Sequence, residues 1–444
     1  MREVSLAVRT TGCKVNQADT EQILRALEDL PIRVVAPDEP ADLAVINACT
    51  VTANADRDGR AAIYRALRGT NGPVFLTGCL AVRLQGAWDA ADRERVRVIP
   101  ESADRDQIVA ALRREVLRIL AKDPDRGPDG SRRGRAASRP ARTRPILKVQ
   151  DGCDHRCAYC IVPLVRGRSR SRPQHDLIAQ ALEYAENGAS EVVLAGVDLG
   201  AWGRDLSPRS DLARLLHELL RLGTGMRFRL SSLEPFQLTE ALVELIGGSP
   251  DLCAHLHLPL QSGSDRILAA MRRPYTAREF ARRVEQAARR IEHLTLGIDC
   301  LCGFPGESPE DFQATYDLVG SLPVTYLHVF PFSPRPRTEA ERLAEGPPRA
   351  VVAERCAALR ALSSQRRRER ASEFVGRRVE VVDLRGRPGG TVEALSAEYF
   401  RVIREDGSAV RRGRHVVKIA AVRDASLVAA RADGPRDART DRVS

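Results

Sequence analysis

The sequence lacks any apolar run that approaches the roughly 20 residues needed to cross a bilayer. Its N-terminus, Met1 to Val4, also lacks the apolar segment of a signal peptide. Both absences argue against membrane insertion and predict a cytoplasmic location. In that compartment the ten cysteines are expected to be metal ligands or buried thiols rather than disulfides.

The composition is typical of a globular protein with more than one domain. The chain has 444 residues, of which 43% are apolar and 29% charged, and this length suits two or three domains. Part of the net charge of +11 is concentrated between positions 132 and 172, where only Asp151 and Asp154 oppose the basic residues. These basic residues are Arg132, Arg133, Arg135, Arg139, Arg142, Arg144, Lys148, Arg156, Arg166, Arg168, Arg170 and Arg172. Such a stripe suits a polyanion such as RNA, and a solvated arginine-rich linker is the alternative.

Strand-like and helix-like segments alternate over the first 120 residues. Strands are predicted at residues 4–9, 42–47 and 73–77, and helices at residues 19–30, 57–67 and 108–120. Because this alternation is typical of a parallel sheet covered by helices, we assign residues 1–121 to an N-terminal α/β domain. Residues 122–145 are rich in Pro and Gly, have no apolar period and predict a flexible linker.

From residue 146 the alternation resumes at intervals of about 30 residues. Strands are predicted at residues 146–150, 191–195, 226–231, 255–260, 295–302 and 326–331, with helices at 174–187, 239–246, 277–291 and 309–320. Six such units predict an incomplete (β/α)6 barrel. With a long charged helix at residues 348–374, this central domain covers residues 146–374.

The remaining sequence changes character. Short segments broken by Gly and Asp between residues 378 and 422 predict a small all-β module, placed at 375–424. Residues 425–444 lack a core-forming pattern and are expected to have no fixed structure. The predicted fold class is therefore α/β, with an N-terminal parallel sheet, a central incomplete barrel and a small C-terminal all-β module.

One loop carries three closely spaced cysteines. Cys153, Cys157 and Cys160 follow the strand predicted at 146–150 with C-x3-C-x2-C spacing. Three thiolates can hold three corners of a 4Fe–4S cube and leave one iron open, which suits binding and reductive cleavage of S-adenosylmethionine (SAM). A zinc site that includes His155 is the alternative. Tyr159 could pack beside a bound adenine or form a wall of the cluster pocket.

A second set of three cysteines belongs to the N-terminal domain. Cys13, Cys49 and Cys79 each follow the carboxyl end of a predicted parallel strand, the edge where ligands bind in open α/β sheets. Small or turn-forming neighbours would let the backbone approach a cluster closely. The alternative is three unrelated buried thiols. The other four cysteines lack such placement and are interpreted as core residues: Cys253, Cys300, Cys302 and Cys356.

Taken together, these motifs resemble those of the radical-SAM methylthiotransferase family, from about residue 4 to residue 422. The N-terminal motifs are Thr11-Gly-Cys13-Lys-Val-Asn16-Gln-Ala-Asp19-Thr-Glu21, Asn47-Ala-Cys49-Thr-Val-Thr52 and Thr77-Gly-Cys79. The central motifs are Lys148 through Cys160, Arg166-Gly-Arg-Ser-Arg-Ser-Arg172, Pro259-Leu-Gln-Ser-Gly-Ser264 and Gly303-Phe-Pro-Gly-Glu307. Three further segments look most like the subgroup that acts on threonylcarbamoyl-adenosine: residues 194–203, 229–235 and 327–332.

The resemblance implies two 4Fe–4S clusters and SAM as cofactors. Cys153, Cys157 and Cys160 would generate a 5′-deoxyadenosyl radical, and the auxiliary cluster on Cys13, Cys49 and Cys79 would hold the sulfur to be delivered. The product would be a methylthio group at carbon 2 of the adenine. Implied partners are the anticodon stem-loop of tRNA and a reducing electron donor (flavodoxin or ferredoxin-like); a monomer and no membrane contact are expected.

Further site residues are expected at the ends of the barrel strands, where such barrels place their active sites. Candidates for SAM binding are Tyr159, Gly196, Ser231, Ser232, Gln261, Asp299 and Gly303, with turn geometry or capping as the alternative for the strand-end residues. Asp198 could meet the modified base, but a helix cap is favoured for it. The alternating arginines from Arg166 to Arg172 could bridge the domains or hold phosphate.

The C-terminal module occupies the place of the family's RNA-binding TRAM module but lacks some of its usual acidic and glycine positions. Its basic residues suit phosphate contacts: Arg401, Arg404, Arg411, Arg412, Arg414 and Lys418. Three alternative functions remain open: the same chemistry on isopentenyladenosine in tRNA, the same chemistry on a ribosomal-protein aspartate, and a non-catalytic iron–sulfur protein that binds RNA.

Overall fold

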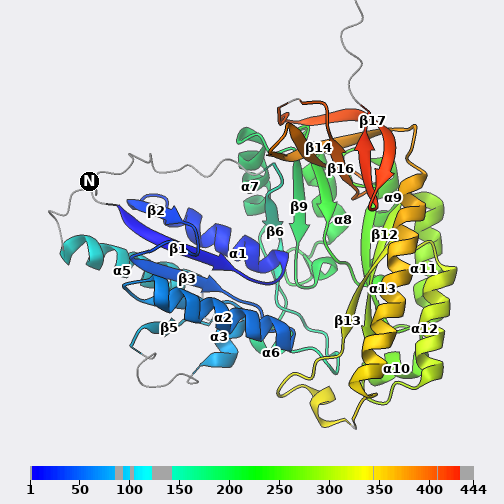
Figure 1. Cartoon of the computed structure of the whole chain (residues 1–444), viewed down its shortest axis with the longest axis horizontal. Helices are drawn as coiled ribbons and strands as arrows, with labels where there is room; N and C mark the ends of the chain where they lie inside the picture. The colour runs from blue at the N-terminus through cyan, green and yellow to red at the C-terminus, as the bar shows by residue number, and fades with distance from the viewer. Residues whose placement is uncertain are drawn as a thin grey trace, which may run out of the picture.

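The computed structural model describes residues 3–85, 94–100, 105–122, 143–343, 345–407 and 409–430. In these ranges the chain forms an N-terminal α/β sheet, a central core of parallel strands and a small C-terminal β-barrel (Figure 1). The predicted fold class is confirmed. Most of the predicted linker and tail lie outside the described ranges. Within these ranges no helix is long and apolar enough to span a membrane.

The N-terminal sheet has five parallel strands in the order β2-β1-β3-β4-β5. The strands are β1 (Val4–Thr10), β2 (Ile32–Val35), β3 (Leu43–Asn47), β4 (Val74–Thr77) and β5 (Val96–Val98). The helices are α1 (Lys14–Arg25), α2 (Ala53–Gly69), α3 (Cys79–Leu84) and α5 (Arg105–Lys122). The two short strands β2 and β5 were not predicted, and α1 begins five residues earlier than expected because it starts directly after Cys13.

The six predicted core strands form two parallel three-stranded sheets, β10-β9-β6 and β11-β12-β13. The strands are β6 (Ile146–Lys148), β9 (Glu191–Ala195), β10 (Arg227–Leu230), β11 (His255–Gln261), β12 (Thr295–Cys302) and β13 (Tyr326–Pro331). Single bridges, Phe228 to Leu252 and Ser232 to His257, connect the two sheets between β10 and β11. The sheets therefore form one open barrel with β6 and β13 at its free edges.

Helices cover the outer face of this core. They are α7 (Gln174–Glu186), α8 (Leu212–Arg221), α9 (Glu240–Gly248), α10 (Asp265–Ala270), α11 (Ala277–Arg290), α12 (Pro309–Ser321) and α13 (Arg349–Ser372). Leucines of α8 show how such a helix is buried: Leu215, Leu216 and Leu219 are fully inaccessible and pack in the main hydrophobic core.

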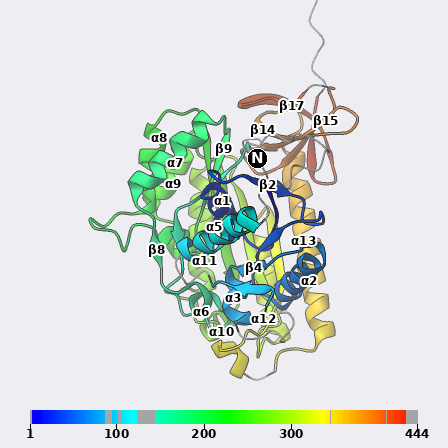
Figure 2. The same cartoon turned by 90° about the vertical axis from the view of Figure 1, so that its left-hand side faces the viewer.

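The N-terminal domain lies against the open side of the barrel (Figures 1 and 2). Helix α1 contacts the edge strand β6, and α3 contacts α6 (Val162–Arg166), which follows the cysteine loop. On the other edge, beyond β13, Arg335 forms an ion pair of 2.8 Å with Asp56 of α2. This arrangement brings the carboxyl ends of the N-terminal strands towards the interior of the core.

The C-terminal module is a closed barrel in the order β14-β15-β16-β18-β17. Its strands are β14 (Arg378–Arg387), β15 (Thr391–Ser396), β16 (Arg401–Arg404), β17 (Arg414–Arg423) and β18 (Ser426–Ala429). The predicted end of the module at residue 424 was wrong, because β18 pairs with both β16 and β17 and closes the barrel. The strand has only four residues, too few to give a clear alternating pattern.

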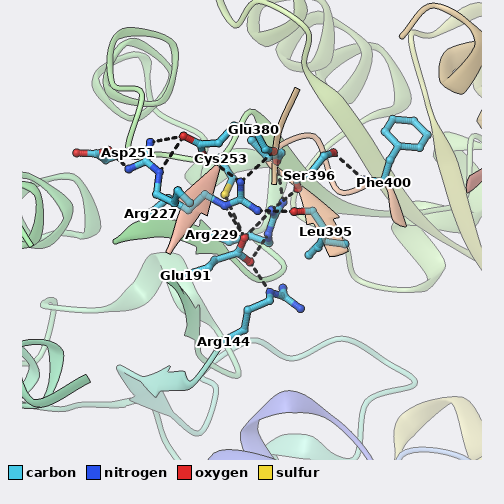
Figure 3. A network of polar contacts seen from close by, with 12 residues as sticks. Arg144, Glu191, Arg227, Arg229, Asp251, Cys253, Glu380, Leu395, Ser396 and Phe400 are labelled. Atoms are coloured by element: carbon cyan, nitrogen blue, oxygen red, sulfur yellow. Dashed lines mark hydrogen bonds and ion pairs between the residues drawn. The ribbon is translucent and has the colours of Figure 1, made fainter. Parts of the chain in front are cut away.

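A buried ionic network attaches this barrel to the amino ends of the core strands (Figure 3). Glu191 begins β9 and is inaccessible; its carboxylate accepts hydrogen bonds from Arg227 (2.7 Å) and Arg229 (2.8 and 3.0 Å). Arg144 is the third arginine and donates a hydrogen bond of 2.7 Å to the same carboxylate. The two strand arginines also donate to backbone carbonyls of the barrel: Leu395 (2.9 Å), Ser396 (3.0 Å) and Ala397 (3.0 Å). The network therefore joins four segments of the chain: residue 144, residue 191, residues 227–229 and residues 395–397.

Candidate functional site

The three N-terminal cysteines lie at one edge of the sheet, as predicted. Cys13 precedes α1, Cys49 follows β3, and Cys79 begins α3. Their strands β1, β3 and β4 are direct neighbours, so the three chain segments meet. Cys13 is exposed and the other two are buried, and burial raises the pKa of the Cys49 thiol.

A glycine makes this close approach possible. Gly12 has a φ of 114°, and a Cβ added to it would lie 2.4 Å from Cβ of Cys49. A side chain at position 12 would therefore push the first two cysteine segments apart.

The central cysteines lie in the loop between β7 (Gln150–Asp151) and α6. The loop turns tightly: the N–H of Cys160 donates to the carbonyl of Cys157 at 3.1 Å. Gly152 has a φ of 69° and has no room for a Cβ, which would lie 1.9 Å from the carbonyl oxygen of Arg168. Burial raises the pKa of both Cys153 and Cys160 to about 12, so without a metal these sulfurs carry protons that metal binding would displace.

The donor chemistry of the two sets fits iron–sulfur clusters. Each set supplies three cysteine sulfurs, and 4Fe–4S clusters are held by cysteine thiolates that bind different irons. Among the described residues, neither three-cysteine set by itself forms a compact group of ligand atoms that could hold one metal ion.

His155 belongs to a different small group. Its Nε2 atom lies 3.0 Å from Oδ2 of Asp198, and ligand atoms of Cys153, His155 and Asp198 all lie within 4.8 Å of one another. This group could hold one ion, but it includes neither Cys157 nor Cys160, with which His155 would share a zinc ion in the predicted alternative. It therefore leaves the C-x3-C-x2-C spacing unexplained.

Asp198 does not cap a helix, which corrects our expectation. Its side chain makes no capping hydrogen bond to the short helix at residues 199–201. It instead accepts a hydrogen bond of 2.6 Å from Nε2 of Gln237 and faces His155. The Asp198 carboxylate therefore binds side-chain donors inside the barrel, Gln237 and His155, in place of the backbone N–H groups of the short helix.

Each cysteine set has one arginine bonded to a sulfur, a feature that sequence analysis missed. Nη1 of Arg273 donates to Sγ of Cys157 at 3.1 Å, and Arg273 also pairs with Glu234. Nε of Arg166 donates to Sγ of Cys79, also at 3.1 Å. Both arginines are at least 90% buried. Their partners are distant in sequence, so spacing alone gave no signal.

Of the residues predicted to bind SAM, the structure joins two in one cluster of polar side chains inside the barrel. Ser232 and Asp299 lie in one cluster, because Oγ of Ser232 is 2.8 Å from Nδ1 of His257, whose Nε2 is 3.2 Å from Asp299. His328 is 3.4 Å from the same carboxylate oxygen. Burial raises the pKa of Asp299, but hydrogen bonds from the two histidines outweigh it and lower the pKa to about 2.

The other candidates have different environments. Tyr159 is partly buried in a small apolar group with Phe304. Gly196 and Ser231 follow β9 and β10, and Gln261 ends β11 with a φ of 68°. Gly303 donates its N–H to Glu307 at 2.7 Å, which agrees with the turn-geometry alternative. His257 and His328 were missed; the alternating His-Leu-His of β11 was the available signal.

Several basic residues expected to meet RNA are used inside the protein, which corrects the prediction. Lys148 is buried and pairs with Asp19 and Asp151. In the C-terminal barrel Arg404 is buried against Asp383, and Arg414 pairs with Asp251 and Glu380. Of the barrel residues predicted to contact phosphate, four stay exposed: Arg401, Arg411, Arg412 and Lys418. The stripe residues from Arg132 to Arg142 lie outside the described ranges.

All four remaining cysteines are buried, in agreement with their interpretation as core residues: Cys253, Cys300, Cys302 and Cys356.

The arginines after the cysteine loop have different environments. Arg166 contacts the N-terminal domain, which agrees with the prediction that these arginines could bridge the domains. The side chain of Arg168, in contrast, is 91% exposed.

Comparisons with known proteins agree with this architecture. Residues 147–319 match the model of the Radical SAM superfamily, and residues 5–98 match the model described as "Uncharacterized protein family UPF0004". A solved radical S-adenosylmethionine methyltransferase, TsrM from Kitasatospora setae, has a similar fold: the TM-score is 0.53 at 16% identity, over 74% of this chain and 73% of that chain. The core and its cysteine loop therefore define a radical SAM enzyme.

Relatives with greater sequence identity show which family of radical SAM enzymes the chain belongs to. Threonylcarbamoyladenosine tRNA methylthiotransferase MtaB from Bacillus subtilis is 34% identical, over 85% of this chain and 84% of the relative. tRNA-2-methylthio-N(6)-dimethylallyladenosine synthase from Mycolicibacterium vanbaalenii is 32% identical, over 85% of this chain and 76% of the relative. The chain belongs to the radical-SAM methylthiotransferase family. It is an enzyme, which sets aside the non-catalytic alternative.

Proposed function

We propose that this enzyme transfers a methylthio group to carbon 2 of N6-threonylcarbamoyladenosine at position 37 of tRNA. The observation that carries the proposal is the match over most of both chains to the Bacillus subtilis protein, whose name states this nucleoside. The segments at residues 194–203, 229–235 and 327–332 support the same subgroup. A second candidate substrate is the dimethylallyl (isopentenyl) adenosine named for the Mycolicibacterium vanbaalenii relative.

In this proposal Cys153, Cys157 and Cys160 hold a 4Fe–4S cluster that binds SAM, and Cys13, Cys49 and Cys79 hold a second cluster. When bound, the first cluster and SAM supply the radical, and the second supplies the sulfur. The protein contributes position and exclusion of water. The N-terminal domain docks on the open side of the barrel, where α3, which begins at Cys79, contacts α6, which follows the cysteine loop.

The remaining groups bind and orient the substrates. We assign Ser232 and Asp299 to SAM or the target nucleoside, because the barrel interior brings them together through His257. The exposed basic residues of the C-terminal barrel are assigned to tRNA phosphates: Arg401, Arg411, Arg412 and Lys418. The target base lies in a single-stranded loop, which proteins commonly bind through splayed bases and backbone. The electron donor is expected to be a flavodoxin or ferredoxin-like protein.

The substrate assignment can be tested with two tRNA substrates that differ only in the modification at position 37. The reconstituted enzyme should form the methylthio product on threonylcarbamoyl-adenosine tRNA at least tenfold faster than on isopentenyladenosine tRNA, measured by mass spectrometry of nucleosides. A tenfold difference corresponds to about 1.4 kcal/mol between the two transition states.

A deletion strain provides the matching control in the cell. Its tRNA should lack methylthio-threonylcarbamoyl-adenosine and keep unmodified threonylcarbamoyl-adenosine. Persistence of the methylthio nucleoside in a strain without a paralogue would contradict the substrate assignment. Loss of the isopentenyl form instead would favour the second candidate.

A further inference from the structure

One buried arginine connects the two cysteine sets. Arg166 ends α6, six positions after Cys160, and is 3% exposed. Its Nε donates to Sγ of Cys79 at 3.1 Å. The residue therefore belongs to the loop of one set and contacts a sulfur of the other.

The rest of the guanidinium is fixed by three further contacts. Nη2 donates to Oδ1 of Asn16 at 2.6 Å and lies 3.2 Å from Oδ2 of Asp19, both on α1. Nη1 donates to Oδ1 of Asp151 at 2.9 Å, on the strand before the cysteine loop. Because these contacts come from both domains, the group keeps its orientation only while the domains stay docked.

Asn16 extends this connection to a second cysteine. The Sγ atom of Cys13 lies 3.7 Å from the same Oδ1 atom of Asn16 that accepts from Arg166. The amide of Asn16 is held in turn by the carbonyl of Thr11 at 3.1 Å. Arg166 is thus linked directly to Cys79 and through Asn16 to Cys13.

The local charges balance, which explains how a guanidinium can be buried here. Arg166 and Lys148 supply two positive charges, and Asp19 and Asp151 supply two negative charges. The carboxylates of Asp19 and Asp151 contact the two Nη atoms of Arg166, and the Nε–H group donates to the sulfur of Cys79. Hydrogen bonds from charged donors are about twice as strong as neutral ones.

A donor on a cluster sulfur has a specific electronic effect. Reduction adds one electron, and part of the added charge resides on the sulfurs, so a cationic N–H group stabilises the reduced state more than the oxidised state. Hydrogen bonds to the sulfurs are among the factors that set iron–sulfur potentials. Outer-shell partners of metal ligands also orient those ligands.

We propose that Arg166 raises the reduction potential of the cluster held by Cys13, Cys49 and Cys79 and fixes that cluster relative to the Cys153–Cys160 loop. This inference rests on the proposed function, which assigns a second cluster to those cysteines. Arg166 acts here as a positioning residue, through the sulfur that it contacts.

The test is a redox titration of the reconstituted full-length enzyme, monitored by electron paramagnetic resonance. Two reduction waves are expected, and addition of SAM identifies the wave of the Cys153–Cys160 cluster. In Arg166→Gln the wave that is insensitive to SAM should move to a more negative potential, while the other wave stays in place. The matched control is Arg168→Gln, two positions further along the chain. Among the described residues, the exposed side chain of Arg168 contacts Asp154 and neither cysteine set, so this substitution should leave both waves unchanged.

A conservative variant protects the test against loss of the fold. Arg166→Lys keeps the positive charge near Asp19 and Asp151 but cannot contact the sulfur and both carboxylates at once, so a smaller negative shift is expected. If Arg166→Gln fails to retain iron, Arg166→Lys carries the measurement. Unchanged potentials in a variant that retains all its iron would overturn the inference and leave the proposed function standing. A wild-type protein with only one wave and about four irons would instead contradict the second cluster itself.

Discussion

Cys157→Ala is expected to lower the iron content of the reconstituted enzyme from about eight to about four atoms per chain. The same change should abolish the reductant-dependent formation of 5′-deoxyadenosine, because a cluster held by two thiolates is lost and SAM has no open iron to bind. Iron analysis and chromatography of the SAM products measure both effects. Product formation on tRNA should stop as well.

This position separates the cluster from a single ion bound by Cys153, His155 and Asp198. A single ion on Cys153, His155 and Asp198 would not need Cys157, so its metal would remain in the variant. Cys300→Ala is the matched control, because Cys300 is an inaccessible thiol of β12 in the main hydrophobic core. It should retain all the iron. Loss of half the iron with 5′-deoxyadenosine formation unchanged would contradict our assignment of the two sets.

Glu191→Ala is expected to cause the largest loss of stability, roughly 3–5 kcal/mol, because it leaves buried guanidinium groups without their carboxylate. Burial alone would raise the pKa of Glu191, but the three surrounding arginines hold it well below the usual range. The folded state therefore gains stability from the ionised carboxylate above the ordinary carboxyl pKa. That gain is lost only as the pH falls through the lowered value.

Because Arg227 and Arg229 also bind carbonyls of the C-terminal barrel, the barrel should loosen first in this variant. Urea unfolding and limited proteolysis near residue 375 measure the two effects. Glu380→Ala is the control: Glu380 contacts Arg227 at 3.1 Å, but its side chain is 28% exposed. Because this carboxylate is partly exposed and bridges Arg227 to Arg414 at the rim of the network, its loss should cost less than the loss of Glu191. Equal losses in the two variants would show that Glu191 is not the centre of the network.

The sequence was sufficient for features that depend on local pattern. The α/β alternation predicted all six core strands, since strand-like segments recur between helices at intervals of about 30 residues. The strand-end positions of Cys13, Cys49 and Cys79 predicted that parallel pairing would bring them together, and the register of β1, β3 and β4 does so.

Features that depend on distant contacts could not be predicted. Arg166 resembles its neighbours Arg168 and Arg170 in sequence, and only docking of the N-terminal domain buries it against Cys79. Charge alone suggested that Lys148 and Arg404 meet RNA, but each has a carboxylate partner far away in the chain. The strand β18 was missed because its four residues acquire order only by pairing with β16 and β17.

If the C-terminal barrel contacts tRNA as proposed, its attachment also sets a minimum size for the substrate. The barrel is fixed at the amino ends of the core strands, whereas the cysteine loop follows their carboxyl ends (Figure 1). Strands of five to eight residues extend about 17–26 Å. A molecule that contacts the exposed arginines of the barrel and also places a base near the cysteines must cover at least that distance. A folded stem-loop can do so and a free nucleoside cannot, so under the proposed function we expect substrates to be selected by their length as well as by their chemistry.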